Sequence, residues 1–343
     1  MWRLDPDPRF TRDAVERGLF ATPFTLLDIG ARGGIADHWS VFGERLEVLA
    51  VEPAEDEPGL SAYLAGEQGT RLFHHRPWPP TDGFYDTGQL YTGTVIEPIM
   101  GIVSSEEVPT TRLVELLGEE QLRRVDFAKL DVEFAELDVL RGAGQLLGSA
   151  LAIETEVHFP KRPREAGCSA EIDLLLQEHG YELYDLELYR YSRAGLPAPR
   201  LYDYRLPDGS RDELGANTEG QPLTGDALYV RTAPPEDADR ALKLACILEL
   251  HRLRDVAFDV LAHAGGAPAG CDPGLLRREP DTLLDRDGNP FGPNFHLHEE
   301  LWRRRWPEFP GEPPVPLPPR FKDVALAMLR RRLRLGSALE SQR

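Results

Sequence analysis

The sequence has few cysteines, no long apolar run and a deficit of basic residues. Its three cysteines, Cys168, Cys246 and Cys271, form no C-x-x-C pair. An odd, scattered set of this kind disfavours a disulfide scaffold and a thiolate zinc site. No run reaches the roughly 18 apolar residues that a membrane-spanning helix needs, and the first residues include no apolar signal core. These absences predict a soluble, cytoplasmic protein without a transmembrane segment.

Acidic residues outnumber basic ones, since 58 Asp+Glu stand against 39 Lys+Arg and give a formal net charge of -19. Such a surface repels phosphate backbones, so nucleic-acid binding is disfavoured and small-molecule partners are favoured. A hydrophobic content of 41% among 343 residues is enough for ordinary cores. This length predicts two domains, or one large domain with an appendage.

Short β-rich runs alternate with helical patterns over the first two thirds of the chain. Strands are expected at residues 24–29, 46–51, 71–75, 125–130, 151–157, 181–191 and 227–230. Helices are expected at 133–147 and 170–179; in the first, apolar residues recur every three or four positions. This alternation predicts an α/β fold with a doubly wound, mostly parallel sheet, in which ligands bind beyond the carboxyl ends of the strands.

The character of the chain changes after the last predicted strand. A helix-rich segment is expected from 241 to 264, and residues 307–319 are rich in proline. We therefore predict one domain at 1–232 and a helical C-terminal region at 233–343. That region is expected to cap the site or to mediate formation of a homodimer.

A glycine-rich turn follows the first predicted strand. Gly30 and Gly34 have no side chains, so a ligand can approach the backbone there. Asp28 lies near the end of the first strand and Glu52 at the end of the second, where a carboxylate can accept hydrogen bonds from ribose hydroxyls. Arg32 replaces the second glycine of the G-x-G-x-x-G fingerprint, which makes NAD or FAD a poor fit. S-adenosylmethionine fits better because it has no pyrophosphate, and a plain glycine turn is the alternative.

A second motif at residues 125–143 carries a dense cluster of charge across a strand end and the start of a helix. Its charged members include Lys129, Asp131, Glu133 and Glu136. Together with the turn at 28–34 and Val51-Glu52-Pro53, this stretch resembles the FkbM family of S-adenosylmethionine-dependent methyltransferases, whose motif reads K-x-D-x-E-G-x-E followed by L-x-x-L-x-G-A. The resemblance covers about residues 24–191.

The resemblance implies a class I methyltransferase fold and O-methylation of a hydroxyl on a sugar, polyketide or related natural product. The residues expected to bind the cofactor are Asp28, Gly30, Ala31, Arg32, Gly34 and Glu52. Two positions depart from the family pattern, since Phe134 replaces the glycine of the motif and Arg32 replaces the asparagine of a D-V-G-A-N turn. We therefore expect the pocket to differ from that of other members at these positions.

Methyl transfer to a hydroxyl requires in-line alignment and removal of a proton. His158, at a predicted strand end, is the first candidate base because a neutral imidazole titrates close to pH 7. Asp131 and Glu156 are the alternatives. The alternative for His158 is a surface histidine at a strand terminus without a catalytic role.

Three further residues are expected on the acceptor side of the pocket. Lys129 and Glu133 come from the charged motif, and Trp78 comes from an aromatic segment at 71–91. Aromatic rings can stack on adenine or on a sugar face, although packing anchors are an equally good interpretation of this segment. For the charged residues the alternative is an ion-pair network at a helix start.

No metal is expected, so the predicted reaction is metal-independent. His296 and His298 lack a well-placed third ligand, and residues 285–289 begin like a calcium loop that lacks its glycine and glutamate. Two competing functions are an NAD-dependent oxidoreductase or epimerase, which Arg32 opposes, and a non-catalytic methyltransferase-like binding or assembly protein. In the latter, Phe134 and Arg32 would close part of the pocket.

Overall fold

The computed structural model divides into two units, residues 1–276 and 277–343, and the fold described below is that of the first. The structure describes residues 4–32, 34–52, 70–73, 93–94, 111–160, 167–191, 193, 195, 204–205, 211–212, 220–235, 237–263 and 268–276. Trp78, the metal patterns at 285–298 and the proline-rich segment lie outside these residues. The predictions made for them therefore stay predictions.

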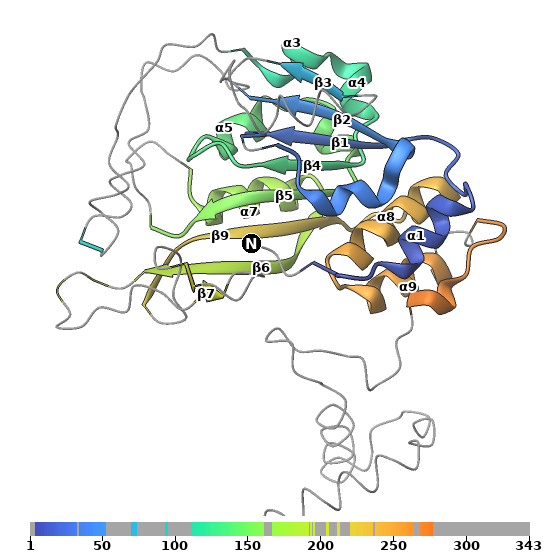
Figure 1. Ribbon diagram of the computed structural model, residues 1–343. Helices are drawn as coiled ribbons and strands as arrows, with labels where there is room; N and C mark the ends of the chain where they lie inside the picture. The colour runs from blue at the N-terminus through green and yellow to red at the C-terminus, as the bar shows by residue number, and fades with distance from the viewer. Residues whose placement is uncertain are drawn as a thin grey trace, which may run out of the picture. The chain divides into compact units, whose positions relative to one another are not determined.

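A seven-stranded sheet in the order β3-β2-β1-β4-β5-β9-β6 forms the centre of the first unit (Figure 1). Its strands are β1 (Phe24–Ile29), β2 (Leu46–Val51), β3 (Thr70–Phe73), β4 (Phe127–Leu130), β5 (Ala152–His158), β6 (Tyr181–Tyr191) and β9 (Gln221–Arg231). Strands β1 to β5 pair in parallel, and β9 is antiparallel to both β5 and β6. The predicted doubly wound, mostly parallel sheet is confirmed. A separate pair, β7 (Tyr204–Arg205) and β8 (Arg211–Asp212), forms a two-stranded sheet.

Helices cover both faces of the large sheet, and each face has its own apolar core. One face packs against α1 (Arg9–Glu16), η1 (Asp37–Arg45), α8 (Ala238–Leu250), α9 (Arg254–His263) and η3 (Pro273–Leu276). The other packs against α3 (Leu113–Leu117), α4 (Glu119–Arg123), α5 (Glu136–Arg141), α6 (Leu146–Ser149) and α7 (Ser169–Glu178). No helix in the described ranges is both long and apolar enough to cross a membrane.

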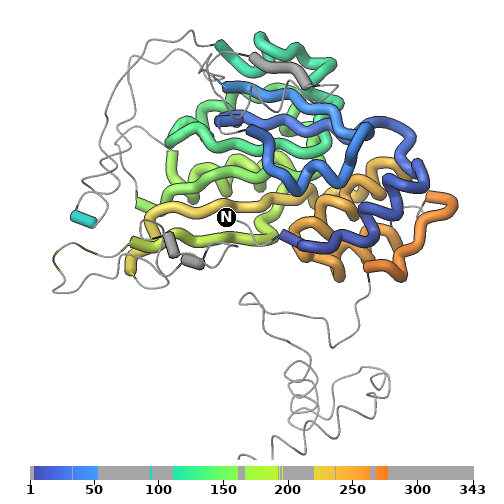
Figure 2. The backbone as a smooth tube through the Cα atoms, viewed as in Figure 1, coloured from blue at the N-terminus to red at the C-terminus, as the bar shows by residue number. Residues whose placement is uncertain are grey.

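Helices α8 and α9 belong to the same compact unit as the sheet, which therefore extends to Leu276, beyond the boundary predicted at 232. The physical reason is burial, because every side chain of α8 from Ala241 to Leu250 is buried. Within α8, the Lys243 ammonium donates to Asp126 at 2.9 Å and to the Pro23 carbonyl at 2.7 Å, beside the start of β1. Figure 2 shows α1, in blue, lying beside α8.

Where one helix was predicted at 133–147, the chain forms two short ones, α5 and α6. Glu133 and Phe134 have φ of 53° and 78°, so the helix begins only at Glu136. Gly144, with φ of 57°, lies between the two helices. Left-handed backbone at these positions interrupts the helical hydrogen bonds although the apolar spacing continues.

Aromatic stacking fixes η1 against the sheet, immediately after the glycine turn. The Phe24 and Phe42 rings stack with centroids 4.1 Å apart, and Trp39 lies 4.7 Å from the Phe127 ring. These contacts join η1 to β1 and β4. The turn between β1 and η1 is thus flanked by a strand and a helix that pack against each other.

Candidate active site

The carboxyl end of β1 carries a buried carboxylate that pairs with the neighbouring strand. Asp28 lies opposite Lys129 of β4, and its Oδ1 is 3.6 Å from the Lys129 ammonium. The same ammonium lies 3.4 Å from Asp131 Oδ2. Burial raises the pKa of Asp28 to about 6; Lys129 lowers it, whereas Asp131 and Glu154 raise it. Burial alone would lower the pKa of Lys129, but the surrounding carboxylates outweigh it and the net direction is upward.

The glycine turn after β1 is a point of close backbone approach. Gly30 has φ of 86°, and a Cβ added there would lie 1.8 Å from the Asp131 carbonyl oxygen, so no other residue type fits. The N–H groups of Gly30 and Ala31 donate to the Val51 carbonyl at 2.9 and 3.3 Å. A ligand at this turn therefore meets side chains and carbonyl groups rather than these two N–H groups.

The remaining predicted cofactor residues lie around that turn. Arg32 is exposed, and Gly34 is half-buried with φ of 95°. Glu52 immediately follows β2 and is 6% exposed. Because β1 and β2 are parallel neighbours, Asp28 and Glu52 lie at the same edge of the sheet, as the sequence predicted.

A second polar group lies on β5, where alternate side chains share one face. The polar residues on this face are Glu154, Glu156 and His158. Glu156 lies directly opposite Asp226 of β9, and Asp226 lies opposite Glu187 of β6. The Tyr189 hydroxyl donates to Asp226 at 2.5 Å. Burial, with Glu154 adding to it, raises the pKa of Asp226 to about 7.

The side chain of His158 contacts a carboxylate of α5. Its side chain is 1% exposed, and its Nε2 lies 3.2 Å from Oε2 of Glu136, which is also buried. Oε1 of Glu136 accepts a hydrogen bond from the Val132 N–H at 2.9 Å. The Phe134 ring lies 4.0 Å from the imidazole, centroid to centroid. These contacts leave the imidazole shielded, so it is poorly placed to meet an acceptor directly.

Phe134 has a backbone conformation that favours glycine, the residue that the family motif has at this position. The residue has φ of 78° and is buried. A left-handed conformation costs a non-glycine residue of order 1–3 kcal/mol, whereas glycine adopts it without that cost. Here the phenyl ring packs against His158 instead of leaving open space.

The structure thus brings the predicted residues into two groups. Asp28, Lys129 and Asp131 form one, and Glu156 with His158 forms the other, whereas Glu133 is exposed. The sequence predicted no individual role for four residues of this region: Glu136, Glu187, Tyr189 and Asp226. For the acidic residues on the strands, the alternation of acidic side chains along the chain could have indicated that they share one face of the sheet.

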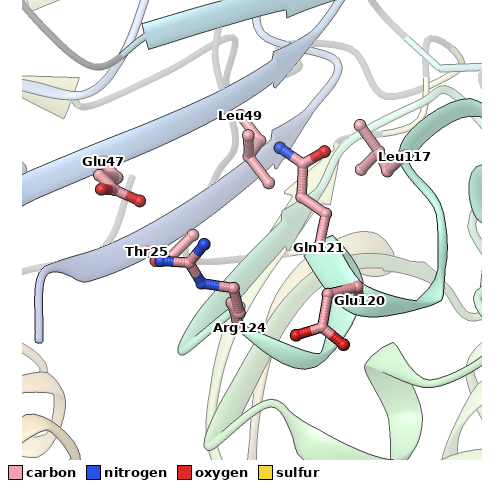
Figure 3. A pocket seen from close by; sticks show the side chains of 7 residues that line it. All are labelled: Thr25, Glu47, Leu49, Leu117, Glu120, Gln121 and Arg124. Atoms are coloured by element: carbon pink, nitrogen blue, oxygen red, sulfur yellow. The ribbon is translucent and has the colours of Figure 1, made fainter.

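A pocket of about 290 Å³ lies at the other end of the strands, near the starts of β1 and β2. Figure 3 shows Thr25, Glu47 and Leu49 from the strands facing Gln121 and Arg124. None of the predicted site residues lines this pocket. We therefore place the candidate active site at the carboxyl edge of the sheet, where the charged groups gather.

Fold and site together define a doubly wound α/β domain with charged side chains at the carboxyl edge of its sheet. Residues 28–183 match the family model described as the methyltransferase FkbM domain. Residues 28–183 are therefore similar to the FkbM methyltransferase domain, and the resemblance stated from the motifs is confirmed.

One curated relative is the AMB antimetabolite synthetase AmbE of Pseudomonas aeruginosa PAO1, which is 38% identical over 73 residues. That match covers 21% of this chain and only 3% of the relative's length. Solved structures similar to this chain include a 1,6-didemethyltoxoflavin-N1-methyltransferase from Burkholderia thailandensis, with 14% identity, coverage of 66% of this chain and 79% of that one, and a TM-score of 0.29. A SAM dependent methyltransferase from Aquifex aeolicus has 12% identity, coverage of 66% and 94%, and a TM-score of 0.29.

Proposed function

We propose that this protein is an S-adenosylmethionine-dependent methyltransferase that methylates a hydroxyl of a small sugar or natural-product acceptor. The observation that carries the proposal is the FkbM methyltransferase domain at 28–183, whose motif residues lie at the carboxyl edge of the sheet. The relative named an antimetabolite synthetase supports an acceptor of the natural-product type.

The residues around the glycine turn fit this cofactor. Oδ1 of Asp28 is buried with no hydrogen-bond donor among the described residues, which suits the ammonium of the methionine end. Glu52 at the end of β2 suits the ribose hydroxyls. The exposed Arg32 suits a carboxylate. When bound, S-adenosylmethionine would supply the methyl group from its sulfonium. The sulfur would keep the electron pair of the bond between sulfur and methyl carbon that breaks.

Asp131 is the residue best placed to take the acceptor's proton. Its side chain is 48% exposed, whereas that of His158 is 1% exposed. The acceptor oxygen would form its bond to the methyl carbon as its proton passes to the Asp131 carboxylate. Lys129, 3.4 Å from that carboxylate, fixes its orientation. Glu133 and Lys129 then border the acceptor.

Variants of the two groups separate cofactor binding from methyl transfer. Asp28→Ala and Glu52→Ala are expected to weaken binding of S-adenosylhomocysteine at least tenfold in calorimetry, because each removes a direct contact. Asp131→Asn should keep that affinity and lose methyl transfer to a panel of hydroxylated acceptors, read as O–CH3 products by mass spectrometry. Glu182→Gln, on an exposed position of β6, is the matched control. Unchanged affinity in both alanine variants would refute the cofactor site.

A further inference from the structure

Three potential metal-ligating side chains converge next to the proposed acceptor site. Glu136, Glu156 and His158 each offer one ligand atom, and these atoms all lie within 4.8 Å of one another. Two of the side chains, Glu136 and His158, are buried, and Glu156 is half-buried. The group forms only in the folded chain, because Glu136 comes from α5 and the other two from β5.

The separation of one pair in this cluster is that of two atoms bound to one ion. His158 Nε2 and Glu136 Oε2 are 3.2 Å apart. Two ligands at about 2.1 Å from a common metal lie about 3.0 Å apart in octahedral geometry and about 3.4 Å apart in tetrahedral geometry. The imidazole nitrogen and the carboxylate oxygen could therefore bind one cation without a change in the distance between them.

The cluster contains one buried nitrogen without a hydrogen-bond partner, and its carboxylates have no paired lysine or arginine among the described residues. His158 Nδ1 is buried and has no hydrogen-bond partner in the described part of the chain. Among the described residues, no lysine or arginine forms an ion pair with Glu136 or Glu156. Two neighbouring carboxylates without a compensating positive charge are costly to bury. A bound cation would remove that cost and would occupy the imidazole nitrogen that now faces Glu136.

We propose that Glu136, Glu156 and His158 together bind one divalent transition-metal cation. Carboxylates suit Mn²⁺ and imidazole suits Fe²⁺ and Zn²⁺, so a site with two carboxylates and one imidazole selects this series over Ca²⁺. Three protein ligands leave coordination positions for water or an acceptor oxygen.

The role of the cation, though not its binding, rests on the proposed function. A cation here would polarise an acceptor hydroxyl and ease loss of its proton to Asp131. This differs from the metal-independent reaction predicted from the sequence. The sequence patterns weighed there, near 285–298, did not include the three residues that the fold brings together.

Metal binding is tested on the full chain after EDTA treatment and desalting. Mn²⁺ is titrated and followed by the loss of its free-ion electron paramagnetic resonance signal, and Zn²⁺ is titrated by calorimetry. The wild type is expected to bind one ion per chain. Glu156→Gln and His158→Gln should each weaken binding at least tenfold, and the Glu182→Gln control should not. S-adenosylhomocysteine is titrated into the same samples with and without metal.

Each outcome decides between the two proposals. Absence of stoichiometric binding of either ion, or undiminished binding by a folded Glu156→Gln variant, overturns the metal site. Glu156 is half-buried and glutamine has its shape, so this variant decides the question even where His158→Gln unfolds. Ion binding without S-adenosylhomocysteine binding supports the metal site and refutes the proposed function. The reverse pattern refutes the metal site alone.

Discussion

Replacement of Asp28 by asparagine tests the electrostatics of the proposed cofactor site through protein stability. Burial raises the pKa of this carboxyl from its ordinary 3.8 to about 6; Lys129 lowers it, and Asp131 and Glu154 raise it. The folded state therefore binds the proton more tightly than the unfolded state. The resulting stabilisation is complete below pH 4 and is lost as pH rises through about 6, opposite to the usual behaviour of a salt-bridged aspartate.

The size of the effect follows from the two pKa values. The difference between 3.8 and 6 corresponds to about 3 kcal/mol of unfolding free energy over the full pH range, of which about 1.4 kcal/mol falls between pH 5 and pH 7.5. Asparagine cannot ionise, so Asp28→Asn lacks this dependence. The unfolding free energy of the variant minus that of the wild type should therefore be about 1.4 kcal/mol larger at pH 7.5 than at pH 5.

Urea unfolding of the cofactor-free protein at pH 5, 6 and 7.5, followed by tryptophan fluorescence, measures this difference. Asp37→Asn, at an exposed position at the start of η1, is the matched control variant. A stability difference that is constant with pH, or that grows toward low pH, would refute the assignment of a raised pKa to Asp28.

Three further predictions concern buried contacts and the cofactor site. Lys243→Met should cost about 3–5 kcal/mol in urea unfolding because it leaves the Asp126 carboxylate buried beside an apolar group; a cost under about 1 kcal/mol would contradict it. Gly30→Ala should destabilise the fold by more than about 2 kcal/mol and abolish S-adenosylhomocysteine binding, since its Cβ would clash with the Asp131 carbonyl. Unchanged affinity for S-adenosylhomocysteine would contradict the assignment of this turn to the cofactor site. Affinity for S-adenosylhomocysteine should rise about tenfold from pH 5 to pH 7 as Asp28 ionises, and a flat calorimetric profile would exclude that contact.

The sheet could be predicted because its strands are short apolar runs that end at clear breaks. Residues 24–29 and 181–191 coincide with β1 and β6. The helix predicted at 133–147 was wrong in its extent, because apolar spacing does not reveal a left-handed backbone. A phenylalanine at position 134 gives no sign of its positive φ, whereas a glycine there would have.

The site could be predicted only where it follows the chain locally. Asp28, Lys129 and Asp131 lie at the ends of adjacent parallel strands, so their proximity followed from the α/β pattern. The insertion of β9 between β5 and β6 is not visible in chain order, and it places Asp226 beside Glu156. The contact of Glu136 with His158 likewise depends on how α5 packs against β5.

The cofactor is the central claim, and calorimetric titration with S-adenosylhomocysteine, with NAD in parallel, tests it most directly. The full chain is first unfolded and refolded to remove any copurified ligand. We predict micromolar binding of one S-adenosylhomocysteine per chain and no heat with NAD. Binding of NAD alone, or of neither ligand by the folded, ligand-free protein, would contradict the proposed function.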